Sequence, residues 1–372
     1  MKNLCLYLSL GALLAYSSST FAYKDTRQHH GLLTDIAIKW VNQCVELDKN
    51  NVYSKSDPES DYFIDEEEAS SLRLNNIWED NPVLSPWRAV NWHFYNPKVD
   101  QYKKTWFYHR SLERIFRYHL SKFEYTGIDS KYIYSVTGQI LHYLEDVTNP
   151  AHIVPVYHAL KIKDNIDPFP IDLDRFNTVF ENLDFEKCQK LARPLSANPG
   201  STADIWELLV QTSEATRTKL QQPICGSDTI WHYFWLPPPA GHTYYNFWCC
   251  RLKCCSEGQC ASCQSEYFGR YVGKDRSDMF GDTKVPLNCG SSNTTELSDL
   301  YKAFVFERHL AAVHADIKAL FWAARYIDYQ SQNPVSARHA QDQYLQAVSP
   351  QLLTGEHEAL PLAQQTGFYL EK

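Results

Sequence analysis

The chain lacks several features that mark common classes of enzyme and membrane protein. Beyond an apolar stretch near the amino terminus, no run approaches the roughly 20 apolar residues that a membrane-spanning helix needs. The sequence has no Gly-rich loop that would cradle nucleotide phosphates, and no motif that presents a nucleophilic serine on a strand-to-helix turn. Nothing therefore favours a membrane-embedded protein, a P-loop enzyme or a serine hydrolase.

Positive charge is also scarce. The chain has 36 Lys and Arg against 44 Asp and Glu, a formal net charge of −8 at pH 7, and no basic run. Affinity for nucleic-acid backbones comes mainly from clustered Lys and Arg, so we expect no stable nucleic-acid partner. Hydrolysis of a phosphodiester by bound metal remains compatible with this charge.

The amino terminus has the pattern of a signal peptide. Lys2 is followed by the apolar stretch "LCLYLSLGALLAY" and by a small residue, Ala22, at a suitable cleavage position. We therefore expect residues 1–22 to be removed, the mature chain to begin at Tyr23, and the protein to be secreted or periplasmic. No lipoprotein-type box precedes Cys5.

Cysteine is unevenly distributed. Of the 11 cysteines, six lie within "CCRLKCCSEGQCASC", from Cys249 to Cys263. In an oxidising compartment this pattern favours disulfides over a zinc knuckle, although the pairing cannot be deduced from sequence.

Apolar residues recur at a spacing of three to four, which predicts helices and an all-α fold. The clearest helices are expected over residues 31–45, 106–123, 132–147, 203–220 and 300–327. The acidic cluster "DEEEASS", from Asp65, is typical of a solvated helix start. We expect one domain over 23–333, with a Cys- and aromatic-rich insertion at 221–293, and a C-terminal extension at 334–372.

The segment "GQILHYLEDVTNPAHIVPVYH", residues 138–158, places histidines and acids in an otherwise apolar helix. His142 and Asp146 are four residues apart, so they project from one helix face and can bind one cation. Asn149-Pro150 is expected to end or kink the helix, which could turn His152 and His158 toward a second metal. Any one of these histidines alone would be read as an ordinary buried side chain, but the ordered set is more specific.

Three motifs together resemble a known family. "LHYLEDVTNPAH" resembles the central motif of the bacterial zinc-dependent phospholipase C family, distant relatives of the S1/P1-type nucleases. "HFYNP", from His93 to Pro97, is similar to an upstream element that supplies a zinc ligand in that family. "HGLLTDIAI", from His30 to Ile38, is similar to its first helix, and the order and approximate spacing of the three agree.

The resemblance implies an all-α domain that holds three zinc ions, with Asp146 bridging two of them. It implies that Asp80 is a ligand, with the adjacent Glu79 left open as the alternative. The remaining implied ligands are the amino group of Tyr23, His30 (preferred over His29), His93, His142 and, for the third zinc, His152.

The third zinc is where the sequence departs from the family. The family completes this site with a later His and an acid four residues apart, and no such pair occurs between His152 and Arg193. His158 is the nearest substitute. The acid could be Asp164, Asp167 or Asp174, and we prefer Asp174 because it begins an amphipathic run.

This ligand set suits phosphodiester hydrolysis. Clustered zinc ions lower the pKa of bound water and stabilise charge on a phosphate, while a carboxylate such as Asp80 can orient the attacking water as general base. The resemblance implies hydrolysis of glycerophospholipids, first among them phosphatidylcholine, to diacylglycerol and a phosphorylated headgroup. The membrane surface is then the partner, and Trp78, Trp92 and Tyr95 are candidates for a choline cage.

Two other functions are compatible with the same sequence motifs. An S1/P1-type nuclease would share the metals and the reaction, but "HFYNP" favours the phospholipase. A non-catalytic secreted metal-binding module would keep the scaffold without turnover. His309 and His314, in the last predicted helix, are expected to be packing residues and not ligands.

Overall fold

The computed structural model describes residues 29–48, 62–80, 93, 95, 111–123, 129–153, 169–195, 201–220, 222–225, 228–229, 286–287 and 295–332. Within these ranges the protein is all-helical apart from two short antiparallel strand pairs, which confirms the expected fold class. The helices are α2 (His29–Leu47), α3 (Glu66–Trp78), α4 (Ser111–Phe123), α5 (Ser130–Asp146), α6 (Pro150–Ile153), α7 (Leu173–Glu181), α8 (Phe185–Leu191), α9 (Thr202–Leu220) and α12 (Leu297–Gln332). The strand pairs are β1 (Pro223–Cys225) with β2 (Asp228–Thr229), and β3 (Pro286–Leu287) with β4 (Thr295–Glu296).

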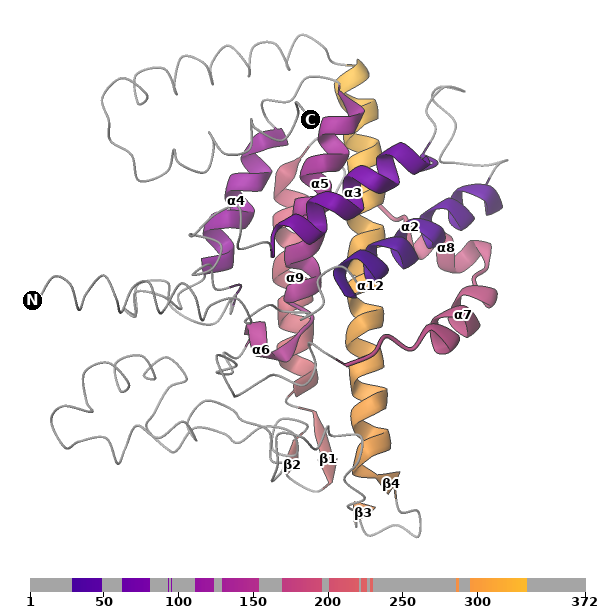
Figure 1. Cartoon of the computed structure of the whole chain (residues 1–372), viewed down its shortest axis with the longest axis vertical. Coiled ribbons are helices and arrows are strands. Elements are labelled where there is room, and N and C mark those ends of the chain that lie inside the picture. Colours follow the sequence, from indigo (N-terminus) through magenta and orange to yellow (C-terminus); the bar gives the residue numbers. More distant parts are fainter. Residues whose placement is uncertain are drawn as a thin grey trace, which may run out of the picture.

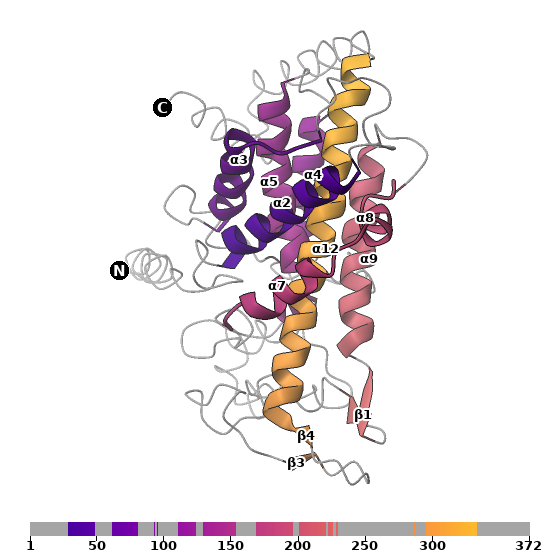
Figure 2. The same ribbon diagram turned by 90° about the vertical axis from the view of Figure 1, so that its right-hand side faces the viewer.

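Helix α5 lies at the centre of the packing. It contacts α3, α12 and α4, while α12 also packs on α2 and α9. In Figure 1 the long helix α12 runs vertically, α2 and α3 cross it, and α4 and α9 lie to its left. Figure 2, turned by 90°, shows α3 and α9 on opposite sides of α12, and α8 packs on α2 and α12. Nearly every side chain of α5 from Ile133 to Asp146 is therefore buried, so any polar group on it must find a partner inside the protein.

The ends of α5 follow from its sequence. Asp129 is the N-cap, and its side chain accepts hydrogen bonds from the backbone N–H groups of Lys131 and Tyr132. The helix ends at Asp146, and Pro150 begins the short helix α6, where a missing N–H costs nothing. The expectation that Asn149-Pro150 ends the helix is confirmed.

A capping box determines where α3 begins, and one glycine of α5 allows α3 to pack closely against α5. Asp65 and Glu68 form a reciprocal capping box, which confirms the predicted helix start. On the facing helix, a Cβ added to Gly138 would lie 2.3 Å from the backbone oxygen of Leu72. Only glycine allows this close crossing, and the crossing carries the end of α3 to the polar end of α5.

A disulfide joins Cys44 of α2 to Cys188 of α8, two residues that are 144 positions apart in sequence. Such a bond fits the oxidising compartment that the predicted signal peptide implies. The cysteines of 249–263, the predicted signal peptide and the extension at 334–372 lie outside the described residues. No helix in the described ranges is long and apolar enough to cross a membrane.

Candidate metal centre

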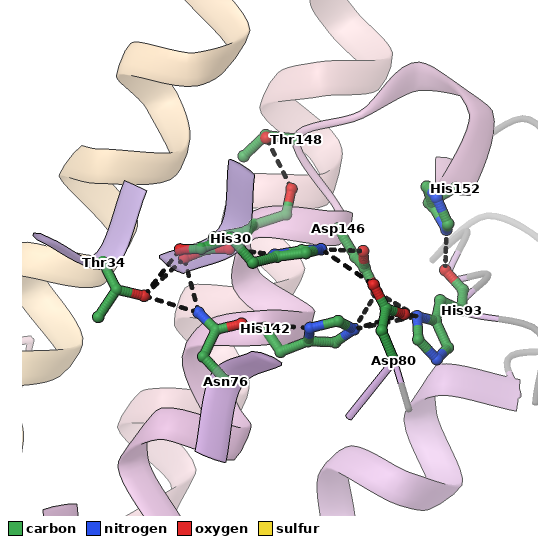
Figure 3. A network of polar contacts seen from close by, with 10 residues as sticks. His30, Thr34, Asn76, Asp80, His93, His142, Asp146, Thr148 and His152 are labelled. Atoms are coloured by element: carbon green, nitrogen blue, oxygen red, sulfur yellow. Dashed lines mark hydrogen bonds and ion pairs between the residues drawn. The ribbon is translucent and has the colours of Figure 1, made fainter. Parts of the chain in front are cut away.

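Five of the side chains predicted as ligands meet in the interior of the helical domain (Figure 3). They come from α2, from the turn after α3, from an isolated described residue between α3 and α4, and from α5. Each of the five is at most 7% exposed. They are His30, Asp80, His93, His142 and Asp146.

Two overlapping groups within this cluster could hold a metal ion. The first consists of His30, His142 and Asp146, and the second of Asp80, His93 and His142; in each, the possible ligand atoms all lie within 4.8 Å of one another. His142 belongs to both groups and lies one turn from Asp146, with 3.5 Å between its Nε2 and an Asp146 oxygen. The sequence spacing therefore does place this pair on one face.

The two carboxylates each face in two directions. Asp146 directs Oδ1 toward Nε2 of His30, 3.8 Å away, and Oδ2 toward Nδ1 of His93, 2.7 Å away. Asp80 directs Oδ2 toward Nε2 of His30, 3.7 Å away, and Oδ1 toward Nε2 of His142, 3.5 Å away. Each acid thus lies between His30 and the pair of His93 and His142, an arrangement that suits bridging of two cations.

The pKa shifts in the cluster indicate that its acids favour a positive charge nearby. Burial acts to lower the pKa of His142, but the carboxylates of Asp146 and Asp80 outweigh it and raise that pKa to about 9. Burial acts to raise the pKa of Asp146, yet His142 and His93 lower it below its usual range. The pKa of His30 is lowered by burial and by His142, so this ring is a neutral imidazole. Without a metal, a proton on His142 supplies part of the charge that a cation would supply.

The donor atoms also fit a metal ion. Among the described residues, Oδ2 of Asp80 and Oδ1 of Asp146 are buried with no hydrogen-bond donor. A buried carboxylate oxygen without a donor is costly unless a cation compensates it. Neutral imidazole and carboxylate are the ligands that zinc takes in catalytic sites. The buried cluster can therefore hold a metal ion.

The adjacent acids Glu79 and Asp80 point to different places. The Glu79 carboxylate accepts a 2.6 Å hydrogen bond from the hydroxyl of Tyr143 and lies 3.5 Å from Nε2 of His119. Asp80, by contrast, lies in the second of the two groups with His93 and His142. Of these two acids, only Asp80 lies in a group of described residues that could hold a metal ion, and its role as a ligand stays a prediction.

His152 lies beside the cluster but belongs to neither group. Its Nδ1 is 2.8 Å from the backbone oxygen of His93 and donates to it, and the N–H of Tyr95 donates back to the backbone oxygen of His152. Its ring centre is 6.2 Å from that of His93. Because Nδ1 is used, a metal would be bound through Nε2, as expected of a ligand to a neighbouring ion.

Asp174, another of the predicted ligands, is not brought to the cluster. Asp174 is exposed in the first turn of α7 and belongs to neither group. Its role in a third zinc site stays a prediction. Tyr23, His158, Asp164 and Asp167 lie outside the described residues, as does Trp92.

Of the three residues predicted to form a choline cage, the structure describes Trp78 and Tyr95. Tyr95 is 1% exposed and packs edge-on against Trp206, with 5.7 Å between the ring centres. Its ring therefore belongs to the core and does not face a headgroup. Trp78, the last residue of α3, is half-buried.

His309 and His314 are packing residues, as expected. His309 is 1% exposed, and burial, with His29 nearby, lowers its pKa to about 3. His314 lies 5.9 Å from Trp40 by ring centres, and burial lowers its pKa to about 4. Neither is part of a metal-binding group among the described residues.

Sequence reasoning missed the groups that hold the ligands. Oδ1 of Asn76 accepts a 3.2 Å hydrogen bond from Nδ1 of His142, and Glu145 contacts Nδ1 of His30. Both rings are thereby turned so that Nε2 faces the carboxylates of the cluster. The one available signal was Glu145 itself, an acid next to Asp146 within a buried stretch of helix.

Comparison with protein-family models, with curated proteins and with solved structures yields no match. The resemblance to the phospholipase C family therefore stays a prediction that rests on the three sequence motifs.

Proposed function

We propose that the protein is a zinc-dependent phosphodiesterase of the phospholipase C type. One observation carries the proposal: five buried ligands from distant parts of the chain converge, and both acids in the cluster face two groups of histidines. A buried set of acids and imidazoles in which acid oxygens lack a donor among the described residues costs stability unless a cation compensates it, so such a set indicates a function.

In this proposal the predicted ligands are shared among three neighbouring zinc ions. His93 and His142 would hold one zinc together with Asp80 and Asp146. His30 would hold a second with Asp146 and the amino group of Tyr23, while His152 would begin a third site with His158 and Asp174 as predicted partners. Zinc bound here would supply a nucleophile at neutral pH and would stabilise negative charge on a phosphate.

Asp80 is the residue best suited to act on the attacking water. Its Oδ2 is buried and has no hydrogen-bond donor within the described residues, so it is available to accept a hydrogen bond from a water molecule. Its Oδ1 lies 3.5 Å from Nε2 of His142, which holds the carboxylate in the cluster. One carboxylate can thus both ligate a metal and orient water as a general base.

The substrate that we propose is a glycerophospholipid, first among them phosphatidylcholine. The products would be diacylglycerol and a phosphorylated headgroup. The "HFYNP" element supports this reading over the nuclease, and the net charge of −8 also disfavours a polyanionic substrate.

The test is hydrolysis of phosphatidylcholine vesicles, with phosphocholine and diacylglycerol assayed separately. Single-stranded DNA is assayed in parallel, and each reaction is run with zinc and after chelation. Asp146→Asn removes a charge from the cluster, and Asp204→Asn, at the half-exposed start of α9, is the matched control.

We expect zinc-dependent release of both lipid products by wild type and Asp204→Asn, and none by Asp146→Asn. Hydrolysis of DNA alone would move the protein to the nuclease alternative. Bound zinc without turnover of either substrate would favour the non-catalytic module, and activity unaffected by Asp146→Asn would contradict the metal centre as the active site.

A further inference from the structure

Tyr143 of α5 contacts two other segments of the chain that supply predicted ligands. It is 0% exposed and directly follows His142 in sequence. Its hydroxyl donates a 2.6 Å hydrogen bond to the Glu79 carboxylate, and its ring packs edge-on against that of His93, with 5.4 Å between the ring centres. Sequence reasoning gave this tyrosine no role.

The hydrogen bond from Tyr143 acts on the turn that carries Asp80. Glu79 is the C-cap of α3, with helical backbone angles, and its N–H donates to the backbone oxygen of Asn76. Successive side chains of a helical backbone point about 100° apart. Holding the Glu79 carboxylate at Tyr143 therefore sets the direction in which Asp80 leaves the turn, toward Nε2 of His142 and Nε2 of His30.

Helix α4 faces Glu79 as well. Nε2 of His119 lies 3.5 Å from the Glu79 carboxylate, within ion-pair distance, and the His119 ring stacks on that of Tyr143. Nδ1 of His119 is 3.1 Å from Nζ of Lys122, which also donates to Gln139. Because an ammonium group only donates, Nδ1 accepts, and in the neutral ring the hydrogen is on Nε2, facing Glu79. Glu79 is thus held by residues of the fold, from α4 and α5.

The ring of Tyr143 supports a second ligand. Nδ1 of His93 lies 2.7 Å from an Asp146 oxygen and 3.2 Å from Nε2 of His142. These contacts require one orientation of the His93 ring. Edge-on packing is a preferred geometry for aromatic pairs, so the contact with Tyr143 favours that orientation.

We propose that Tyr143 is a positioning residue for the metal centre. Its hydroxyl fixes Glu79, and through Glu79 the turn that carries Asp80, while its ring orients His93. Groups that orient the ligands of a metal contribute to its affinity without touching it. The inference rests on metal binding, the first step of the proposed function, and not on the reaction that follows.

The experiment measures zinc affinity by competition with a chelator, together with the visible spectrum of the cobalt-substituted protein. Tyr143→Phe keeps the ring and removes only the hydroxyl, whereas Tyr143→Leu removes both contacts. Glu79→Leu removes the acceptor, and it is made alone and together with Tyr143→Phe. The denaturation midpoint of each metal-free variant is measured as well.

Tyr326→Phe is the matched control. Tyr326 of α12 is 2% exposed, its hydroxyl donates to the backbone oxygen of Phe123, and its ring packs on Phe123 and Trp322. The substitution therefore also removes a buried hydroxyl that donates a hydrogen bond, but one whose partner is not beside a predicted ligand.

We expect Tyr143→Phe to weaken zinc binding by about 10-fold and Tyr143→Leu by about 100-fold, and both to shift the cobalt spectrum. Tyr326→Phe should lower the denaturation midpoint as Tyr143→Phe does, yet keep the zinc affinity within about threefold of wild type and the spectrum unchanged, because distant sites act independently. The double variant should bind zinc no more weakly than Glu79→Leu alone, since the hydroxyl acts through Glu79.

Four results would overturn the inference. Wild-type zinc affinity and an unchanged cobalt spectrum in Tyr143→Phe would show that the hydroxyl does not act on the metal centre. Equal losses of affinity in Tyr143→Phe and Tyr326→Phe would show that lost stability is the cause. A weaker affinity in the double variant than in Glu79→Leu would show that the hydroxyl does not act through Glu79. A wild-type protein that binds no zinc would remove the centre altogether.

Failure of the proposed function would look different. Variants that follow the expected order in a protein that hydrolyses no phospholipid would support the role of Tyr143 and contradict only the proposed reaction.

Discussion

The buried histidines of α5 and α12 have opposite electrostatic character. His142 is 0% exposed and His309 is 1% exposed, so solvent is absent from both. Burial, with His29 nearby, lowers the pKa of His309 to about 3, whereas Asp146 and Asp80 outweigh burial and raise the pKa of His142 to about 9. A buried histidine is therefore not by itself a sign of a metal site. The sign is a buried histidine whose neighbours are acids that lack donors.

The largest predicted effect comes from removing the acid that distinguishes the two histidines. Asp146→Asn should weaken zinc binding by more than about 100-fold, beyond the loss expected when only a supporting group is removed. In the metal-free variant the pKa of His142 should fall from about 9 toward values typical of buried imidazoles, because its largest favourable charge is gone. NMR titration of the histidine ring protons measures this pKa. An unchanged value would mean that the acids do not set the character of the site.

A second prediction concerns the close crossing that brings α3 to α5. Gly138→Ala places a Cβ 2.3 Å from the Leu72 backbone oxygen, so the helices must separate. Overpacking of this kind destabilises by about 1–3 kcal/mol, and here it also draws Asn76 away from His142. Both the denaturation midpoint and the zinc affinity should therefore fall.

The matched control for that crossing is Gly31→Ala. Its Cβ would lie 3.0 Å from the flexible end of Ile77, which can move aside. Within a helix, alanine is more favourable than glycine by roughly 0.5–1 kcal/mol. This gain offsets the small rearrangement of Ile77, so the variant should stay near wild-type stability. Equal effects of the two substitutions would contradict the account of the crossing.

Another predicted effect lies on the α12 side of the comparison, at His309. An unfolded histidine titrates near 6.5 and the folded His309 near 3, so between these values the unfolded state binds the extra proton. Stability should fall as the pH drops below about 6.5, by about 1.4 kcal/mol per pH unit for one such group. His309→Gln should remove that share of the slope, as measured by urea unfolding at a series of pH values. A slope that does not change would show that His309 is not held neutral in the folded protein.

His142 should contribute with the opposite sign in the metal-free protein. Its folded pKa of about 9 lies above the unfolded value, so its stabilising contribution is complete below pH 6.5 and is lost as the pH rises through about 9. Comparison of wild type and Asp146→Asn at alkaline pH isolates this contribution. Equal alkaline stability profiles would contradict the raised pKa.

The local features of the site could be predicted from sequence. Helical periodicity places His142 and Asp146 on one face, and Asn149-Pro150 ends α5 where the chain must turn toward His152. Asp65 marks the start of α3 for the same kind of local reason. Each of these inferences depends on residues within about two helical turns of one another.

The supporting groups could not be predicted because they depend on contacts between distant segments. Asn76 meets His142 across 66 positions, and Glu145 meets His30 across 115. The sequence could not separate Glu79 from Asp80, because the difference depends on Tyr143, 64 positions from Glu79. The Tyr143 hydroxyl donates a hydrogen bond to Glu79, whereas Asp80 lies in the cluster. The Cys44–Cys188 disulfide likewise joins segments that no local pattern links. Packing of α2 and α3 against α5 decides the contacts of Asn76, Glu145 and Glu79, and packing of α8 on α2 brings the two cysteines together.

The metal centre is tested most directly by a crystal structure of the zinc-loaded protein, with anomalous diffraction recorded at the zinc absorption edge. We expect anomalous peaks at coordination distance, about 2.0–2.2 Å, from Nε2 of His142 and from oxygens of Asp80 and Asp146. A zinc-soaked crystal with no peak near these three side chains would contradict the claim that the buried cluster is a metal centre.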